Sequence, residues 1–191
     1  ALRHFSDQQP DVDIEVVPGG LFTGTPARPY AELSAYIKGA EVRLKEVTGY
    51  KPSDAFHVMI TLDNHNEAAS ERPAHAIMQM NALAPDLAVE FAHLLQEAHF
   101  GLGKDVNDPG TYDDLCAEHG YPALDTTAIT NATLADPLVA KGFERARKLG
   151  PSGYPTIFVT DQNDNVVGTI PSTYDPAAFL SEFTKIRDAR A

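Results

Sequence analysis

Residues 153–160, Gly-Tyr-Pro-Thr-Ile-Phe-Val-Thr, join a proline step to a run of β-branched and aromatic side chains. That run, residues 156–160, predicts a strand. A proline has no N–H to donate to a β-ladder, so Pro155 at the mouth of the strand marks an edge or an unusual backbone. A cis Tyr154–Pro155 bond would turn the Tyr154 amide and carbonyl outward, where an extended ligand could pair with them. An ordinary trans turn is the alternative.

The strand begins a hairpin. Residues 161–165, Asp-Gln-Asn-Asp-Asn, have turn chemistry, and residues 166–170, Val-Val-Gly-Thr-Ile, predict a second strand. Asp161 and its neighbours imitate a calcium loop, but Val166 stands where such a loop needs glycine, so a plain turn is predicted. Asp175-Pro176 predicts the start of a final helix.

The residues before this hairpin are a short β-containing start and a long helical stretch. Residues 1–9 predict the end of a helix. Residues 12–17, Val-Asp-Ile-Glu-Val-Val, alternate apolar and acidic side chains as a half-buried strand does, and Pro18-Gly19-Gly20 ends that strand. Residues 29–149 have apolar residues at helical spacings, and Asp108-Pro109 and Asp136-Pro137 predict two of the helix starts.

Two helices in this stretch have further local signals. Ser70 is predicted as an N-cap, with Pro73 in the first turn that follows. The first long helix is predicted to end at Gly49 and to bury one apolar stripe. That stripe consists of Leu33, Ile37, Ala40, Leu44 and Val47.

Length and composition exclude several classes of protein. The chain has 191 residues, of which 43% are hydrophobic and 22% charged, which predicts one globular domain or a core with an insertion. The formal net charge of −12 repels phosphate, so nucleic acid and anionic membranes are not expected partners. No apolar run approaches the roughly 20 residues of a membrane span, and no apolar leader is recognisable.

The chain has one cysteine, Cys116, so neither an internal disulfide nor a Cys-x-x-Cys motif is available within these residues. Cys116 is predicted to be a small buried hydrophobic residue. One cysteine and no export signal predict a cytoplasmic protein. Because the sequence does not begin with methionine, it is expected to be trimmed or only part of the encoded chain.

The histidines give no metal site. There is no His-Glu-x-x-His motif, and His93 and His99 are six residues apart, which places them well round a helix from each other. Histidines at the surface or satisfied inside the core are predicted, and no metal is expected. Motifs of nucleotide-binding loops and of serine hydrolases are absent from the sequence.

Several motifs along the chain occur in the order seen in one known family. Residues 17–22, Val-Pro-Gly-Gly-Leu-Phe, resemble its "GGL" step, and residues 70–74 resemble the helix start inside its inserted domain. Residues 91–100 are similar to its "LQ-A-F/Y" helix, and residues 153–156 look like its cis-proline loop. The chain thus resembles the DsbA-like branch of the thioredoxin superfamily, in particular its predicted protein-disulfide isomerases and dithiol oxidoreductases.

The resemblance implies an α/β fold, a thioredoxin-like core with an inserted all-helical domain. Residues 1–26 and 150–191 would form the core and residues 27–149 the insertion. Members of the family carry a first strand and a Cys-x-x-Cys motif before the "GGL" step, and neither is present after Ala1. The catalytic cysteine pair is therefore expected upstream of Ala1, with no catalytic residue inside these 191 residues, which alone are expected to be redox-inactive.

The expected function is thus that of a bacterial thiol–disulfide oxidoreductase or isomerase. Its substrate would be a thiol or disulfide protein or a small thiol, bound by Gly153, Tyr154, Pro155 and Thr156. No cofactor is expected, and homodimer formation is compatible with the family.

Two alternatives remain open at this stage. One is an enzyme like the kappa-type glutathione transferases and 2-hydroxychromene-2-carboxylate isomerases, which resemble the same fold, use a serine near the place of the cysteine motif and bind glutathione at the cis-proline loop. A redox-inactive thioredoxin-fold module that binds extended peptides is the other. The residues encoded before Ala1 distinguish the three.

Overall fold

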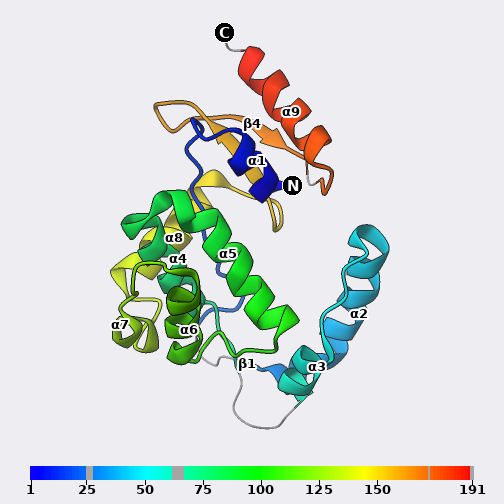
Figure 1. Ribbon diagram of the computed structural model, residues 1–191, viewed down its shortest axis with the longest axis vertical. Helices are drawn as coiled ribbons and strands as arrows, with labels where there is room; N and C mark the ends of the chain where they lie inside the picture. Colours follow the sequence, from blue (N-terminus) through cyan, green and yellow to red (C-terminus); the bar gives the residue numbers. More distant parts are fainter. Residues whose placement is uncertain (25–27, 62–66, 172, 190–191) are drawn as a thin grey trace.

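The structure is a computed structural model that describes residues 1–24, 28–61, 67–171 and 173–189. It is rich in helices and has two small antiparallel sheets. Helices α1 and α9 lie with the β3–β4 hairpin at one end of the molecule, whereas α4 to α8 form a group below them (Figure 1). Helices α2 and α3 lie to the side of that group (Figure 1).

The end that contains both termini is built on the predicted hairpin. Strand β3 (Ile157–Thr160) pairs with β4 (Val166–Ile170), with Ile157 opposite Ile170 and an irregularity in register between Val159 and Thr160. The hairpin prediction is confirmed. Helices α1 (Leu2–Gln8) and α9 (Pro176–Asp188) pack together beside it. The buried residues of this cluster are Phe5, Ile170, Phe179 and Phe183.

The predicted strand over residues 12–17 is wrong. The side chains alternate as expected, since Val12 and Ile14 pack against the cluster of α1 and α9 whereas Asp13 and Glu15 are exposed. A strand, however, needs a neighbouring strand for its main-chain donors and acceptors. In the part of the chain that the structure describes, no strand pairs with residues 12–17. The Val16 carbonyl instead accepts a hydrogen bond from the Asn81 side chain at 2.8 Å.

The helical group contains α4 (Glu71–Leu83), α5 (Ala88–Gln96), α6 (Pro109–His119), α7 (Thr126–Thr130) and α8 (Pro137–Leu149). A 3-10 turn, η1 (Pro85–Leu87), precedes α5, and a π-helical turn, η2 (Glu97–Gly101), follows it. Helices α4 to α7 bury one apolar cluster, the largest fully buried members of which are Tyr112, Phe91, Met80 and Ile129.

The Asp-Pro helix starts are confirmed. The carboxylates of Asp108, Asp136 and Asp175 accept hydrogen bonds from the amides of Gly110, Leu138 and Ala177, each at 2.9 Å. Each proline is the first helical residue, where its missing N–H has no helical acceptor to lose. The signal is local, because the cap and the amide that it satisfies are two residues apart, so a short stretch of sequence is enough to predict it.

The third group consists of α2 (Tyr30–Thr48), α3 (Asp54–Thr61) and the short pair β1 (Arg28–Pro29) and β2 (Glu67–Ala68). Gly49 has φ +74° and its N–H bonds to the Lys45 carbonyl, so the predicted helix end is confirmed. The predicted buried stripe is only partly correct. Leu33 is buried and Ile37 packs on α3, but Ala40 and Val47 are exposed, because the eight-residue α3 covers only one end of the longer α2.

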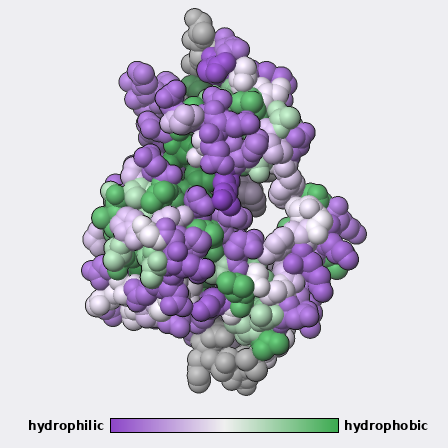
Figure 2. Space-filling model, in the orientation of Figure 1, coloured by the Kyte–Doolittle hydropathy of each residue, from purple (hydrophilic) through white to green (hydrophobic). Residues whose placement is uncertain are grey.

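Ser70 lies at the predicted N-cap of α4, but its side chain does not cap that helix. Its Oγ instead accepts a hydrogen bond from the Phe22 amide at 2.9 Å, and its own amide donates to the Phe22 carbonyl at 2.8 Å. These bonds join the segment after Gly20 to the start of α4. The space-filling view shows a mainly hydrophilic face that is hollowed between α2 and the rest of the molecule (Figure 2). No helix among the described residues is long and apolar enough to span a bilayer.

Candidate functional site

The four residues singled out by the sequence lie in one surface loop that leads into β3. The Tyr154–Pro155 peptide bond is cis. Gly153, Tyr154 and Pro155 are exposed, and the exposed fraction of Tyr154 reaches 54%. Thr156 is half-buried, and its hydroxyl donates to the Gly153 carbonyl at 2.6 Å, which closes the loop on itself. The loop therefore presents an aromatic ring and main-chain groups to solvent.

The Tyr154 ring lies directly on the glycine pair that follows residues 12–17. Its hydroxyl donates to the Gly19 carbonyl at 3.1 Å. A Cβ on Gly19 would lie 2.4 Å from the Tyr154 Cε1 atom, closer than two carbon atoms can approach. Only glycine allows the ring to lie this close to the main chain. The loop and the "GGL" step, 135 residues apart in sequence, are therefore one unit in the structure.

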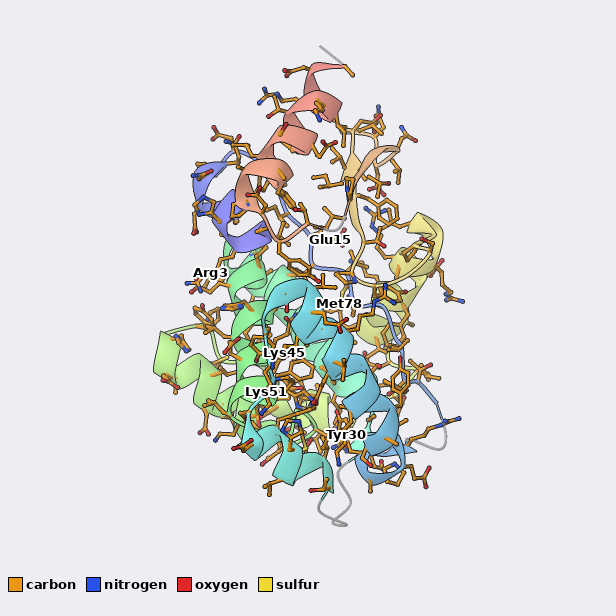
Figure 3. The ribbon with its side chains drawn as sticks, turned by 90° about the vertical axis from the view of Figure 1, so that its right-hand side faces the viewer. Arg3, Glu15, Tyr30, Lys45, Lys51 and Met78 are labelled. Atoms are coloured by element: carbon orange, nitrogen blue, oxygen red, sulfur yellow. The ribbon has the colours of Figure 1, made fainter. Side chains whose placement is uncertain are left out.

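The opposite side of this glycine segment rests on α8. Gly20 has φ +67°, a conformation that favours glycine, and a Cβ at this position would lie 3.0 Å from the Phe143 ring. A Cβ on Gly142 would meet the Pro18 ring at 2.7 Å and the Met78 sulfur at 3.1 Å. Met78 lies where the two ends of the molecule meet (Figure 3). This support from α4 and α8 was not predicted from the sequence, although a glycine inside a predicted helix, Gly142, was an available signal.

An arginine on α8 holds the hairpin turn near the same segment. The Arg145 guanidinium donates two hydrogen bonds to the Asp164 carboxylate and one to Glu15 at 3.2 Å. The hydrogen bonding of Arg145 to the Asp164 carboxylate is the main reason that the pKa of Arg145 is raised. Both carboxylates are exposed, so the arrangement positions the turn more than it adds stability.

The cysteine of the chain lies in a different place. Cys116 is on α6, 5% exposed, within the apolar cluster of the helical group. Burial raises the pKa of its thiol, so the reactive thiolate is disfavoured at neutral pH. The prediction of a small buried residue is confirmed, and Cys116 supplies no nucleophile to the loop.

The buried histidines are satisfied by neighbours, as predicted. His99 is 7% exposed, and its two ring nitrogens contact the Lys104 carbonyl at 3.0 Å and the Tyr30 hydroxyl at 3.4 Å. Burial is the main cause of the lowered pKa of His99. His75 is held by Gln79 at 2.9 Å. Over residues 1–24, 28–61, 67–171 and 173–189, no three His, Cys, Asp or Glu side chains gather as metal ligands would.

Comparisons with known proteins give one informative result. No protein-family model and no curated protein sequence matches the chain. Among solved structures, the chain is similar to the cytosolic disulfide reductase DsbM from Pseudomonas aeruginosa. The TM-score is 0.69 at 20% sequence identity, and the match covers 98% of this chain and 87% of that one. The chain therefore has a DsbA-like thioredoxin fold, a thioredoxin-like core with a helical insertion, as the order of its motifs predicted.

Proposed function

We propose that this chain is the substrate-binding part of a thiol–disulfide oxidoreductase or isomerase. The observation that carries the proposal is the exposed loop of residues 153–156, with its cis Tyr154–Pro155 bond, at the start of β3 in a DsbA-like fold. The catalytic cysteine pair lies before Ala1 in the encoded protein, because Cys116 is single and buried. Residues 1–26 and 150–191 form the core, and residues 27–149 form the insertion.

Disulfide reduction by such a protein takes two exchange steps. A thiolate of the enzyme attacks one sulfur of the substrate disulfide, and the other sulfur leaves as a thiolate. The second enzyme thiolate then attacks the mixed disulfide and releases the reduced substrate, so the enzyme pair is oxidised as the substrate gains two electrons. A thiol reductant returns the pair to its dithiol form.

The residues of this chain orient the substrate in both steps. The loop offers the main-chain N–H and carbonyl of Tyr154 to an extended segment of the substrate on either side of its sulfur. The segment would bind as an added β-strand does, through main-chain hydrogen bonds. The Tyr154 ring, fixed on Gly19, sets the position of those groups. Holding the sulfur in line with an attacking thiolate is the source of the rate gain, since exchange depends on access as well as on thiolate content.

The substrate is a thiol or disulfide protein or a small thiol, and the protein acts in the cytoplasm. The disulfide reductase to which the chain is similar is described as cytosolic, which supports this location. Because the net charge of −12 repels other negative surfaces, the natural substrate does not bind through a strongly acidic surface of its own.

Insulin reduction driven by a small thiol tests the proposal on the encoded protein and on the chain that starts at Ala1. The encoded protein is expected to turn over, whereas the shorter chain is not. In the encoded protein, Pro155→Ala should lower kcat/KM by about tenfold or more, since small displacements of a positioned substrate have large effects on rate. Pro171→Ala is the matched control, because Pro171 is also exposed but follows β4.

The proposal is wrong if the chain from Ala1 turns over alone or if the encoded protein has no cysteine pair. A serine in that place, together with glutathione binding at residues 153–156, would instead identify the transferase or isomerase alternative. Peptide binding at the loop without any upstream cysteine would identify a redox-inactive binding module.

A further inference from the structure

Helix α2 leaves part of its apolar stripe uncovered. Tyr36, Ala40, Arg43 and Val47 are spaced by four, three and four residues, so they share one face of the helix, called the α2 face below. All four are exposed, and the exposed fractions of Tyr36 and Val47 are 68% and 59%. Aromatic and arginine side chains are enriched in protein interfaces, and exposed apolar patches mark them. The α2 face therefore has the composition of an interface.

The segment around this face is positive, unlike the rest of the chain. Residues 28–51 contain five Lys and Arg against three Glu, a formal charge of +2. The remaining residues contain ten Lys and Arg against 24 Asp and Glu, a formal charge of −14. All five cations of the segment are exposed. The α2 face thus suits a partner surface that is negative and also has apolar side chains.

Such a surface is present elsewhere on the same chain. Residues 86–125 contain nine Asp and Glu against one Lys. Within this acidic region a groove of about 480 Å³ lies between residues 98–104 and α6. This volume is more than ten times the roughly 30 Å³ that one water molecule occupies in the liquid, so the groove has room for several side chains. Its apolar lining consists of Ala98, Leu102, Leu115 and Ala117.

The charged side chains of the groove leave one negative group available. Lys104 and Asp114 form an ion pair at 3.2 Å, so their charges offset each other. Glu118 is exposed and is the remaining charged residue of the lining. An apolar groove with a carboxylate beside it matches an apolar helix face that carries one cation, which is how helices are bound in grooves.

The two surfaces do not meet within one molecule, because α2 and α6 lie on opposite sides of α5 in Figure 1. We propose that the protein forms a two-fold dimer in which the α2 face of each copy lies in the groove of the other, with Arg43 next to Glu118. The same contact then forms twice, so each has to bury about half of the roughly 1,200–2,000 Å² of a stable interface. A second copy is the occupant because every molecule carries both complementary surfaces.

Sedimentation velocity of the encoded protein tests the proposal. The protein should sediment as a dimer that dissociates on dilution. Tyr36→Ser removes the largest apolar side chain of the α2 face, and it should weaken dimer formation by about tenfold or more. Tyr174→Ser is the matched control, because Tyr174 is 57% exposed but lies just before α9, outside both surfaces. It should change dimer formation by less than about twofold.

Charge reversal separates this contact from the general repulsion between two negative molecules. Arg43→Glu and Glu118→Arg should each weaken the dimer by about tenfold or more, because each places like charges together. Glu144→Arg makes the same change in net charge as Glu118→Arg at an exposed position on α8, and it should not weaken the dimer. With Arg43→Glu and Glu118→Arg combined, opposite charges face each other again, so dimer formation should return to within about threefold of that of the unchanged protein.

Three results would overturn the proposal. The first is a protein that stays monomeric at every concentration, and binding of a basic helical peptide to the groove of that monomer would assign the groove to another partner. The second is a dimer that neither Tyr36→Ser nor Arg43→Glu weakens, since its contact would lie elsewhere. The third is a Glu118→Arg variant that dimerises as well as Glu144→Arg. None of these results depends on the proposed redox function, since association is measured without a thiol substrate.

Discussion

Substitution of Gly19 by alanine tests the contact on which the loop geometry depends. The new Cβ would stand 2.4 Å from the Tyr154 Cε1 and 2.5 Å from its Cζ, whereas carbon atoms in contact are at least about 3.5 Å apart. The ring must therefore move by about 1 Å. Since Tyr154 is 54% exposed, the ring can move outward, but it then loses its hydrogen bond to the Gly19 carbonyl. With that bond worth about 1 kcal/mol and some packing lost, Gly19→Ala should lower the free energy of unfolding by about 1–2 kcal/mol.

Urea unfolding of a double-mutant cycle isolates this contact. In a Tyr154→Ala background the added methyl has open space, so the effect of Gly19→Ala should fall to within about 0.5 kcal/mol of zero. Gly39→Ala is the control, because a Cβ there meets nothing within 4 Å, and inside α2 it should stabilise by about 0.5–1 kcal/mol. An effect of Gly19→Ala that is the same with and without the Tyr154 ring would refute the reasoning.

Three further predictions concern the helical part. Cys116 should react with a thiol reagent only after unfolding, because burial raises its pKa; fast labelling of the folded chain would contradict this. Burial lowers the pKa of His99 from 6.5, so below about pH 6.5 the unfolded chain binds a proton at this residue that the folded chain does not. The free energy of unfolding should therefore be highest above about pH 6.5 and should fall with decreasing pH by up to about 1.4 kcal/mol per pH unit. Urea unfolding followed across pH should show a smaller slope in His99→Asn. Asp136→Ala removes two hydrogen bonds to the start of α8 and should cost about 1–2 kcal/mol in thermal unfolding, whereas Asp136→Asn should recover most of it; equal losses would exclude capping as the cause.

The features that sequence predicted well are those whose causes lie within a few residues. Asp136 and its proline begin α8 because the carboxylate and the amides that it caps are neighbours in sequence. The turn at residues 161–165 was also predictable, because its polar residues lie directly between the two strands in the sequence. The strand prediction for residues 12–17 was wrong because alternation reports which side chains are buried, whereas a strand also requires a partner strand, and no strand among the described residues pairs with this segment.

The candidate site shows the same division. The β-branched and aromatic run after Pro155 was enough to place residues 153–156 at the start of a strand. Neither the Tyr154 ring on Gly19 nor the packing of Gly142 against Pro18 could be foreseen, since each contact joins segments more than 100 residues apart.

The most direct test of the central claim is an NMR titration of the backbone amides with an extended peptide that carries a disulfide-protected cysteine. The account predicts saturable shifts concentrated at Gly153, Tyr154 and Thr156 and at the underlying Gly19, with loss of those shifts in Pro155→Ala. Shifts confined to the helical part, or a binding pattern unchanged in Pro155→Ala, would contradict it.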